Sequence, residues 1–335
     1  MYIVLPLIEE SVILHIKKGC AMKRILVTGV NSYIGNAVER YLGEFNAREG
    51  RECYRIDKIS LRDGSWEDMA FGAYDAVLHV AGIAHADIGK VSEETKALYY
   101  QVNCDLAVKV AEKAKAEGVQ QFVYLSSVIV YGDSAKVGGT KHITAETQPR
   151  PANFYGDSKW QAEQKLRELE AAGTSEQASQ DVPTDELPFH VAIIRPPMVY
   201  GKGSKGNFPM LVKLAEKMPV FPDIPNQRSM IYVGNLAEYI RLLIENGKGG
   251  TFLPQNAEYV TTAQMVRTIG TVKNKKVRLW KILNPLVKLA AVVPGKIGGM
   301  ANKAFGSLTI DRALSEQDLQ GYQIYSLEES IRRSV

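Results

Sequence analysis

Tyr155 and Lys159 are the residues of this chain whose types and spacing best fit proton chemistry. On a helix, side chains four residues apart lie on one face and can share one site. A phenol is a poor base at neutral pH because its pKa is about 10. A nearby ammonium favours the phenolate, so the pair forms a usable proton acceptor for a hydroxyl. Tyr-x-x-x-Lys also occurs by chance on solvated helix faces, and its meaning therefore depends on the elements that position it.

The first of those elements is a strand–turn–helix pattern. Residues 23–28 form a strand-type run that enters a turn at Gly29, and a helix pattern follows and ends near Gly43. Such a unit presents free backbone N–H groups and a positive helix end to a pyrophosphate. Gly29 permits the tight turn and Gly35 allows close helix packing, whereas Ser32 occupies the position of the usual middle glycine. The predicted dinucleotide-binding residues are Gly29, Asn31, Ser32, Tyr33, Ile34 and Gly35.

A second apolar segment, residues 53–56, ends at Asp57, which lies 22 residues after Gly35. A carboxylate about 20 residues past the last glycine hydrogen-bonds the ribose hydroxyls of NAD, and it repels the extra phosphate of NADP. The sequence therefore favours NAD. Lys58 and Arg62 weaken this preference, so NADP stays open, and Asp57 can also be read as an ordinary turn residue at a strand end.

With these motifs in order, the chain resembles the extended short-chain dehydrogenase/reductase family, and within it the NAD-dependent epimerase/dehydratase group, such as the UDP-glucose 4-epimerases. The resemblance runs from Met22 to about Asn256. It implies an α/β fold, a Rossmann-type doubly wound parallel sheet with a smaller C-terminal substrate-binding lobe. Strands that alternate with helical patterns favour the same fold. We expect an NAD-binding domain over 22–190, with the last sheet strands and the substrate-binding lobe over 191–335, interleaved with it.

The resemblance also adds residues to the cofactor site. A strand over 74–82 is expected to pass under the dinucleotide, and small residues at its end let the backbone approach the cofactor closely. A long amphipathic helix that opens at Tyr100 and runs to Gly118 places an asparagine near the active-site strands. The residues after Arg195 are expected to cover the nicotinamide. By the resemblance, the added cofactor-binding residues are Leu61, Val80, Ala81, Gly82, Asn103, Tyr155, Lys159 and Pro196.

By the family's spacing the catalytic hydroxyl is Ser127, which follows a strand that begins at Phe122 and precedes Tyr155 by 28 residues. Its implied role is to hydrogen-bond the sugar oxygen. Without the resemblance, Ser127 is an ordinary strand-to-loop cap. Val128 and Ile129 stand where sugar 4,6-dehydratases carry an Asp-Glu pair, and apolar side chains cannot transfer protons. We therefore do not expect a dehydratase.

The second half of the chain is expected to supply the substrate side. Asn207 and Arg228 match positions that bind the nucleotide diphosphate in relatives, and a guanidinium can donate two parallel bonds to such a group. Met198 stands where UDP-galactose-type epimerases carry Asn, so one expected contact is missing. The predicted catalytic residues are Ser127, Tyr155 and Lys159. The predicted substrate-binding residues are Ser127, Tyr155, Met198, Asn207 and Arg228.

The reaction implied by the resemblance is 4-epimerisation of a nucleotide sugar, UDP-glucose or a UDP-N-acetylhexosamine, by transient oxidation at C4 with NAD. Two catalytic alternatives stay open. One is an NAD(P)H-dependent 4-reductase of a UDP-4-keto-6-deoxy sugar, and the other is an epimerase of a lipid-linked sugar diphosphate. A non-catalytic NAD-binding sensor is a third alternative, although such relatives typically lose the Tyr or the Lys, and both are present here.

Composition limits the remaining possibilities. The chain has 335 residues, of which 45% are hydrophobic and 23% charged, with a net charge of +4, as in an ordinary soluble globular protein. No basic run with interleaved aromatic residues indicates nucleic acid as a partner. The three cysteines and five histidines show no metal-ligand spacing, so we expect no metal and a reducing, cytoplasmic location. A homodimer is the expectation from family habit.

Two segments fall outside the family pattern. Residues 1–21 begin with an apolar run that Glu9 and Glu10 interrupt, and no basic region leads it, so we expect neither a signal peptide nor a bilayer span. We predict that this extension is disordered or loosely attached. Residues 280–293 are apolar with interspersed lysines. We interpret them as a helix that caps the substrate lobe, with an interfacial helix in peripheral contact with a membrane as the alternative.

Overall fold

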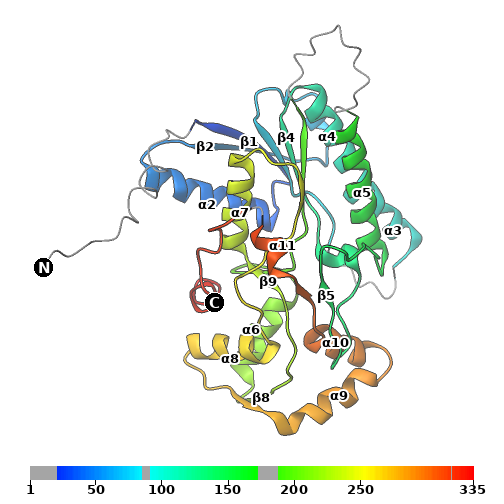
Figure 1. Ribbon diagram of the computed structural model, residues 1–335, viewed down its shortest axis with the longest axis vertical. Helices are drawn as coiled ribbons and strands as arrows, with labels where there is room; N and C mark the ends of the chain where they lie inside the picture. The colour runs from blue at the N-terminus through cyan, green and yellow to red at the C-terminus, as the bar shows by residue number, and fades with distance from the viewer. Residues whose placement is uncertain (1–20, 85–90, 173–187, 318) are drawn as a thin grey trace, which may run out of the picture.

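The computed structural model describes residues 21–84, 91–172, 188–317 and 319–335 (Figure 1). The prediction about the N-terminal extension therefore lies almost entirely outside the described residues. The centre of the molecule is a six-stranded sheet with strand order β10-β6-β4-β3-β1-β2, in which every neighbouring pair is parallel. Its strands are β1 (Lys23–Thr28), β2 (Tyr54–Ile59), β3 (Ala76–His79), β4 (Gln121–Leu125), β6 (His190–Ile194) and β10 (Gly250–Phe252).

Helices cover both faces of this sheet. On one face α2 (Tyr33–Glu49) and α7 (Val233–Glu245) share a core with β1 and β6. On the other, α4 (Leu106–Ala116) and α5 (Phe154–Ala171) form a second core with β3 and β4. The chain places β2 on one side of β1 and then crosses to β3 on the other side, so the strand order reverses between β1 and β3. Ligands of open α/β sheets bind at the carboxyl ends of the strands at such a point. The predicted doubly wound Rossmann-type fold is confirmed.

A smaller lobe lies beyond the carboxyl ends of the strands, in the lower half of Figure 1. A third core holds its elements together, with Phe208, Phe221 and Val266 among its members. Two short parallel pairs, β7 with β9 and β8 with β11, belong to this half of the chain. Its elements are β7 (Met198–Tyr200), α6 (Asn207–Lys217), β8 (Val220–Pro222), β9 (Met230–Tyr232), α8 (Thr262–Val272), β11 (Arg278–Trp280), α9 (Asn284–Val292), α10 (Lys296–Phe305) and α12 (Leu327–Arg332).

Smaller elements connect the two parts. The strand pair β5 (His142–Ile143) and β12 (Thr309–Ile310) joins the loop after β4 to the C-terminal segment. The 3-10 helices are η1 (Ser65–Glu67), η3 (Val128–Tyr131) and η4 (Lys281–Leu283), and α11 (Arg312–Glu316) follows β12. Because β6 and β10 complete the main sheet from the second half of the chain, the sheet and the lobe are interleaved in sequence. The domain boundary predicted at 190/191 stays a prediction.

Two helices differ from the sequence-based expectation. The helix after the glycine turn does not end near Gly43 but continues to Glu49, where Gly50 caps it with φ 66°. Gly43 has open space around its Cα, so the helix passes through it without a packing conflict. The long helix expected from Tyr100 begins earlier, as α3 (Glu93–Tyr100), and passes through a π-helical turn, η2 (Gln101–Asp105), into α4.

Candidate active site

The glycine turn has the geometry that a pyrophosphate site needs. Gly29 follows β1 with φ 91°, and a Cβ there would lie 3.1 Å from Cα of Ala81. The Ser32 hydroxyl caps α2 by accepting from the Gly35 N–H at 3.3 Å. The first turn of α2 holds no acidic residue, so the positive end of the helix is open to an anion. Asn31 is exposed in the turn, whereas Tyr33 and Ile34 are partly buried.

At the second strand, Asp57 has protein partners. Its carboxylate accepts from the Tyr74 hydroxyl at 3.0 Å and lies 3.4 Å from the Arg24 guanidinium. Lys58, which weakened the preference for NAD, pairs with Glu39 of α2 at 2.6 Å. The contact of Asp57 with a ribose therefore stays a prediction. Leu61, which is expected near the adenine, packs partly buried against the second core.

The end of β3 forms the floor of the site. Val80 is buried, Ala81 lies under Gly29, and Gly82 is exposed. A Cβ at Gly82 would lie 3.0 Å from the Asn103 side-chain oxygen and 3.2 Å from the Lys159 ammonium. Only a glycine fits here without displacing one of those groups, and the contact of Gly82 with a cofactor stays a prediction.

Asn103 ties this floor to the neighbouring helix. It is fully buried in the π turn η2, a kind of turn often found at functional sites. Its side-chain oxygen accepts from the Ile83 N–H at 2.8 Å, and its amide donates to the Ile83 carbonyl at 3.0 Å. The same amide donates to the Ser158 hydroxyl on α5 at 3.1 Å. Asn103 therefore fixes the position of the β3 loop relative to α5.

Ser127, Tyr155 and Lys159 converge at the carboxyl ends of β4 and β6. Asn153 caps α5 by accepting from the Gly156 N–H at 3.0 Å, which starts the helix at the residue before Tyr155. The Tyr155 phenol is partly buried and hydrogen-bonds the Ser127 side chain. One turn later, buried Lys159 donates to the Leu125 carbonyl at 3.0 Å. These three predicted catalytic residues thus occupy one site.

The two titratable groups of this trio have shifted pKa values. Burial raises the pKa of Tyr155 to about 12; the neighbouring Tyr99 adds to the rise, and the hydrogen bond from Ser127 opposes it. Burial lowers the pKa of Lys159 to about 8, and the carboxylate of Glu163 opposes that change. At neutral pH the phenol is therefore protonated and the lysine is largely cationic.

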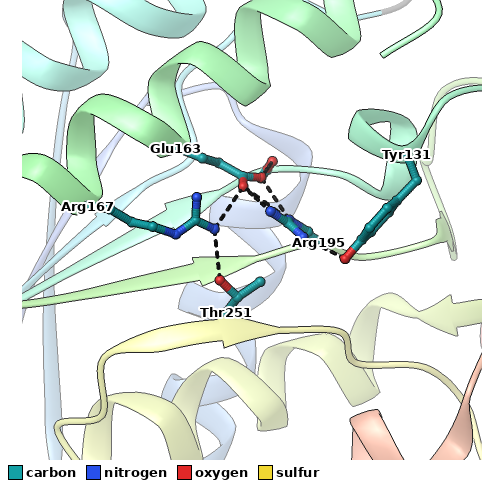
Figure 2. Close-up of polar contacts among 6 residues, drawn as sticks. Tyr131, Glu163, Arg167, Arg195 and Thr251 are labelled. Atoms are coloured by element: carbon teal, nitrogen blue, oxygen red, sulfur yellow. Dashed lines mark hydrogen bonds and ion pairs between the residues drawn. The ribbon is translucent and has the colours of Figure 1, made fainter. Parts of the chain in front are cut away.

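A buried ion-pair network centres on Glu163, four residues after Lys159 on α5 (Figure 2). Glu163, one helical turn beyond Lys159, is fully buried and receives the Arg195 Nε at 3.0 and 3.1 Å and Arg167 at 3.2 Å. Arg195 in turn donates to the Tyr131 hydroxyl at 2.5 Å. Ser126, the first residue after β4, donates to the same carboxylate at 2.5 Å. The network joins α5 to the residues that directly follow β4 and β6.

Sequence reasoning did not assign a function to Glu163 or Tyr131. The partners are separated by 32 residues in the case of Glu163 and Arg195, so no local spacing connects them. Two signals were present nevertheless. Glu163 continues the four-residue spacing of Tyr155 and Lys159, and Arg195 directly follows a buried apolar strand, where an arginine needs a partner.

The remaining predicted residues lie after β6 and in the lobe. Pro196 is buried and its carbonyl accepts from the Val128 N–H at 3.2 Å. Met198 begins β7, and Asn207 is the first residue of α6; both are partly buried. Arg228 donates to the carbonyls that end α10, at 2.7 Å from Lys303. Its guanidinium thus caps a helix, and its contact with a diphosphate stays a prediction.

No group of three or more His, Cys, Asp or Glu side chains in the described part of the chain is placed to hold a metal ion. None of the described helices is long and apolar enough to cross a membrane. The two cysteines within the described residues, Cys53 and Cys104, are buried and free.

The chain is similar in sequence to known sugar 4-epimerases. The chain is 30% identical over 266 residues to a UDP-glucose 4-epimerase of Vibrio cholerae, covering 77% of this chain and 75% of that protein. It is 27% identical over 297 residues to an N-acetyl-alpha-D-glucosaminyl-diphospho-ditrans,octacis-undecaprenol 4-epimerase of Escherichia coli O157:H7, covering 85% and 80%.

Among solved structures, UDP-glucose-4-epimerase of Stenotrophomonas maltophila with bound NAD and formylated UDP-arabinopyranose matches with a TM-score of 0.66. The match covers 93% of this chain and 96% of that chain, and at 18% identity it shows the shared fold alone. A sequence profile of one family, described as the NAD dependent epimerase/dehydratase family, matches residues 25–253. The chain belongs to the NAD-dependent epimerase/dehydratase family.

Proposed function

We propose that this protein is an NAD-dependent 4-epimerase of a sugar diphosphate, working by transient oxidation at C4 of the sugar. The observation that carries the proposal is the convergence of Ser127, Tyr155 and Lys159 beside the exposed floor at Gly82. A hydroxyl, a phenol and a cation on one side of a nucleotide cleft are the groups that a reversible alcohol oxidation requires.

The residues around the glycine turn fit the cofactor. Gly29 and Gly35 bring the backbone close, Ser32 orders the first turn of α2, and Gly82 leaves room beside Lys159. We propose that these residues, with Asp57 at the ribose, hold NAD. Bound NAD supplies the acceptor and donor of the hydride, and Tyr155 and Ser127 handle the proton and the oxygen of the sugar.

In this proposal Tyr155 removes the C4 hydroxyl proton while Ser127 donates a hydrogen bond to the same oxygen. The phenol needs a lower pKa than its buried value of about 12, and a cation lowers it. Lys159, one turn away on α5, is the cation to which we assign this effect once substrate and cofactor are bound, since it is not among the causes of the Tyr155 pKa in the free protein. Because the pKa of Lys159 is about 8, its cationic form declines above pH 8, and turnover is expected to decline there too.

The diphosphate of the substrate could be attached to either of two groups, a uridine nucleoside or a polyprenyl lipid. Relatives named above act on a UDP-sugar and on a sugar linked through diphosphate to undecaprenol, and both groups present the same diphosphate next to the reacting sugar. We propose Met198, Asn207 and Arg228 as residues near that diphosphate. A cytoplasmic location, a homodimer and a peripheral membrane contact through 280–293 belong to the same proposal.

The test is Tyr155→Phe, which removes the proton acceptor and keeps the ring. We expect turnover to fall by about 10²- to 10⁴-fold, with NAD binding nearly unchanged. Tyr100→Phe is the matched control, because the Tyr100 phenol bonds Asp157 at 2.8 Å instead of facing Ser127. Full turnover in Tyr155→Phe would rule out the proposed role.

A second measurement separates the alternatives. The purified protein is assayed with C4-epimeric UDP-sugars and with a polyprenyl diphosphate sugar, with and without added NADPH, and its retained cofactor is identified. Epimer interconversion without added reductant supports the proposal. Stoichiometric consumption of NADPH on a 4-keto sugar identifies a reductase, and retained NAD that no sugar reduces identifies a sensor.

A further inference from the structure

The helices α9 and α10 form a hairpin at the lower rim of the molecule in Figure 1, and several of their large apolar side chains are exposed. In the described chain, fourteen large hydrophobic side chains are exposed, and eight of them lie between residues 280 and 300. Such clustering marks an interaction site, whereas single exposed apolar residues need no explanation. The eight are Trp280, Ile282, Leu286, Leu289, Val292, Val293, Ile297 and Met300.

Apolar residues recur at helical spacing along and beside the first helix. Within α9, Leu286 and Leu289 are three residues apart, a spacing that places side chains on one helical face. Ile282 in η4 and the C-cap residue Val293 continue the steps of three or four residues on either side. In a helix that caps a core, this face would be buried. Within the described chain, α9 buries none of its residues, and Leu286 and Leu289 are 63% and 65% exposed. The α9 side chains therefore do not bury themselves against the lobe core as the predicted capping helix would.

Polar contacts and one aromatic pair hold the hairpin in this orientation. The Asn284 amide donates to the Asp223 carbonyl at 2.8 Å, at the start of α9. The Asn302 amide donates to the Ala291 and Gly298 carbonyls at 2.9 Å and so joins the two helices. At the end of α10, Phe305 stacks on Phe221 of the lobe core, with 5.7 Å between ring centroids. The apolar face is thus presented by a fixed element.

The chain segment that carries this face contains charges of one sign only. Residues 259–310 contain nine Lys and Arg and no Asp or Glu. The remaining chain holds 32 of the 41 basic residues against all 37 acidic ones, so the whole positive excess comes from this segment. Seven of the nine cationic side chains are exposed in the described chain: Arg267, Lys275, Lys276, Arg278, Lys281, Lys288 and Lys303.

We propose that the α9–α10 hairpin docks the protein on an anionic phospholipid bilayer, and that the sugar diphosphate it acts on is anchored in that bilayer. This inference rests on the proposed function for its substrate. An apolar helical face surrounded by lysines inserts at the level of the lipid head groups, and its affinity grows with apolar area and with anionic lipid. With nine residues, α9 is about 13 Å long, so it lies along the bilayer surface.

Charge and connectivity favour this occupant. A second copy of the chain would bring the same cationic face against itself, and like charges oppose that contact. The inner end of the hairpin also reaches the substrate lobe, because Arg228 bonds the last carbonyls of α10. Arg228 is the residue proposed to lie near the diphosphate, so the docked face and the substrate site are joined through one side chain.

The first test is flotation of the purified full-length chain with vesicles of phosphatidylglycerol and phosphatidylcholine, and with phosphatidylcholine alone. We expect flotation with the anionic vesicles and about a tenfold fall in partitioning for Leu286→Ser/Leu289→Ser. Lys281→Glu/Lys288→Glu should weaken binding mainly at low salt. The matched control is Leu98→Ser/Ile324→Ser, two apolar residues exposed elsewhere, at 46% and 42%.

Retained flotation in Leu286→Ser/Leu289→Ser, or its absence in the unaltered chain, would overturn the docking face. A second result would also overturn it. If the unaltered chain binds no vesicles and sediments as a dimer, and Leu286→Ser/Leu289→Ser sediments as a monomer, then the face binds a second copy of the chain. These readouts need no catalysis, so failure of the proposed epimerase activity leaves them interpretable.

The second test addresses the substrate. A polyprenyl diphosphate sugar in anionic vesicles is compared with the same sugar diphosphate on a short, water-soluble alkyl chain. We expect Leu286→Ser/Leu289→Ser to lower the ratio of the two turnover rates by about tenfold, while Leu98→Ser/Ile324→Ser keeps it. An unchanged ratio would overturn the bilayer-anchored substrate. Absence of turnover on both substrates in every variant would instead contradict the epimerase proposal, with flotation still testing the docking face.

Discussion

Two regions of this molecule have the same helical spacing of residues but place opposite kinds of side chain at it. On α5, Tyr155, Lys159, Glu163 and Arg167 follow one another at four-residue steps and form an inner row, in which Lys159 and Glu163 are buried charges. On the α9–α10 hairpin the residues at such steps are apolar and exposed. Both regions depart from the ordinary rule that charge lies outside and apolar surface inside.

The difference between the regions lies in their partners. In the inner row the carboxylate of Glu163 bonds Arg195, Arg167 and Ser126, so the cost of burying charge is offset within the chain. The exposed leucines of α9 are not covered in the described chain. A closed set of partners produces a rigid site that is ready for chemistry. An uncovered apolar face has its full stability only when a partner from outside covers it.

The largest expected effect comes from breaking the inner row. Glu163→Gln leaves buried Arg195 without its counter-charge, and we expect a loss of about 3 to 5 kcal/mol in the free energy of unfolding. Urea denaturation measures it. Glu168→Gln, an exposed position on the same helix, should change stability by less than about 0.5 kcal/mol. Equal stability of the two variants would show that the network contributes little.

The same row should give stability a pH dependence above neutrality. The pKa of Lys159 is about 8 in the folded chain, against an ordinary value of 10.5. Between these values the unfolded chain binds a proton that the folded chain has released, so stability rises with pH. Relative to Lys159→Met, the unaltered chain should gain about 3 kcal/mol between pH 8 and 10.5.

Denaturation series at fixed pH values test this gain. Lys165→Met provides the control, because Lys165 lies on the exposed side of α5 and pairs with Asp105 at 3.1 Å. That variant should keep the rise seen in the unaltered chain. If Lys159→Met keeps it too, the buried lysine is not its source.

The fold and the pairing of Tyr155 with Lys159 could be predicted because each rests on short-range patterns, whereas the choice of Ser127 needed the family resemblance, and the catalytic roles of all three stay predictions. The glycine turn, the strand runs and the Tyr-x-x-x-Lys spacing are all read within a few residues. The network of Glu163 and Arg195 could not be predicted in this way, since its partners meet only after β6 joins the sheet beside β4. Likewise, nothing local distinguishes the leucines of α9 from those of a core helix, because both follow the same periodicity.

Arg228 shows what a sequence pattern leaves out. The matching position predicts a diphosphate contact, which stays a prediction, and it does not reveal that the guanidinium donates to carbonyls at the end of α10. Those carbonyls lie 75 residues further along the chain, in a segment outside the family resemblance. A motif can indicate that an arginine stands at a given place, but the competing partners come from the tertiary structure.

Acid should weaken the inner region through His79, a smaller effect. This imidazole is fully buried at the end of β3, and its Nδ1 lies 3.1 Å from the Thr28 hydroxyl. Burial and the charge of Lys159 lower its pKa from 6.5 to about 3. Below pH 6.5 the unfolded chain gains a proton that the folded chain does not bind. The free energy of unfolding therefore decreases as the pH is lowered, by about 2 kcal/mol at pH 5. His79→Leu should lose less stability between pH 7 and pH 5; equal losses would assign the acid sensitivity to other groups.

The smallest expected effect belongs to the hairpin and sharpens the comparison most. Leu289→Ser removes an apolar side chain that is already 65% exposed, so the free energy of unfolding in solution should change by less than about 0.5 kcal/mol. The same substitution at Leu243, which is fully buried in α7, should cost more than about 3 kcal/mol. A partner that binds only the folded state stabilises it. Anionic vesicles should therefore raise the stability of the unaltered chain, and should raise that of Leu289→Ser by less. A large loss for Leu289→Ser in solution would mean that this leucine is covered within the chain, and the contrast between the two regions would disappear.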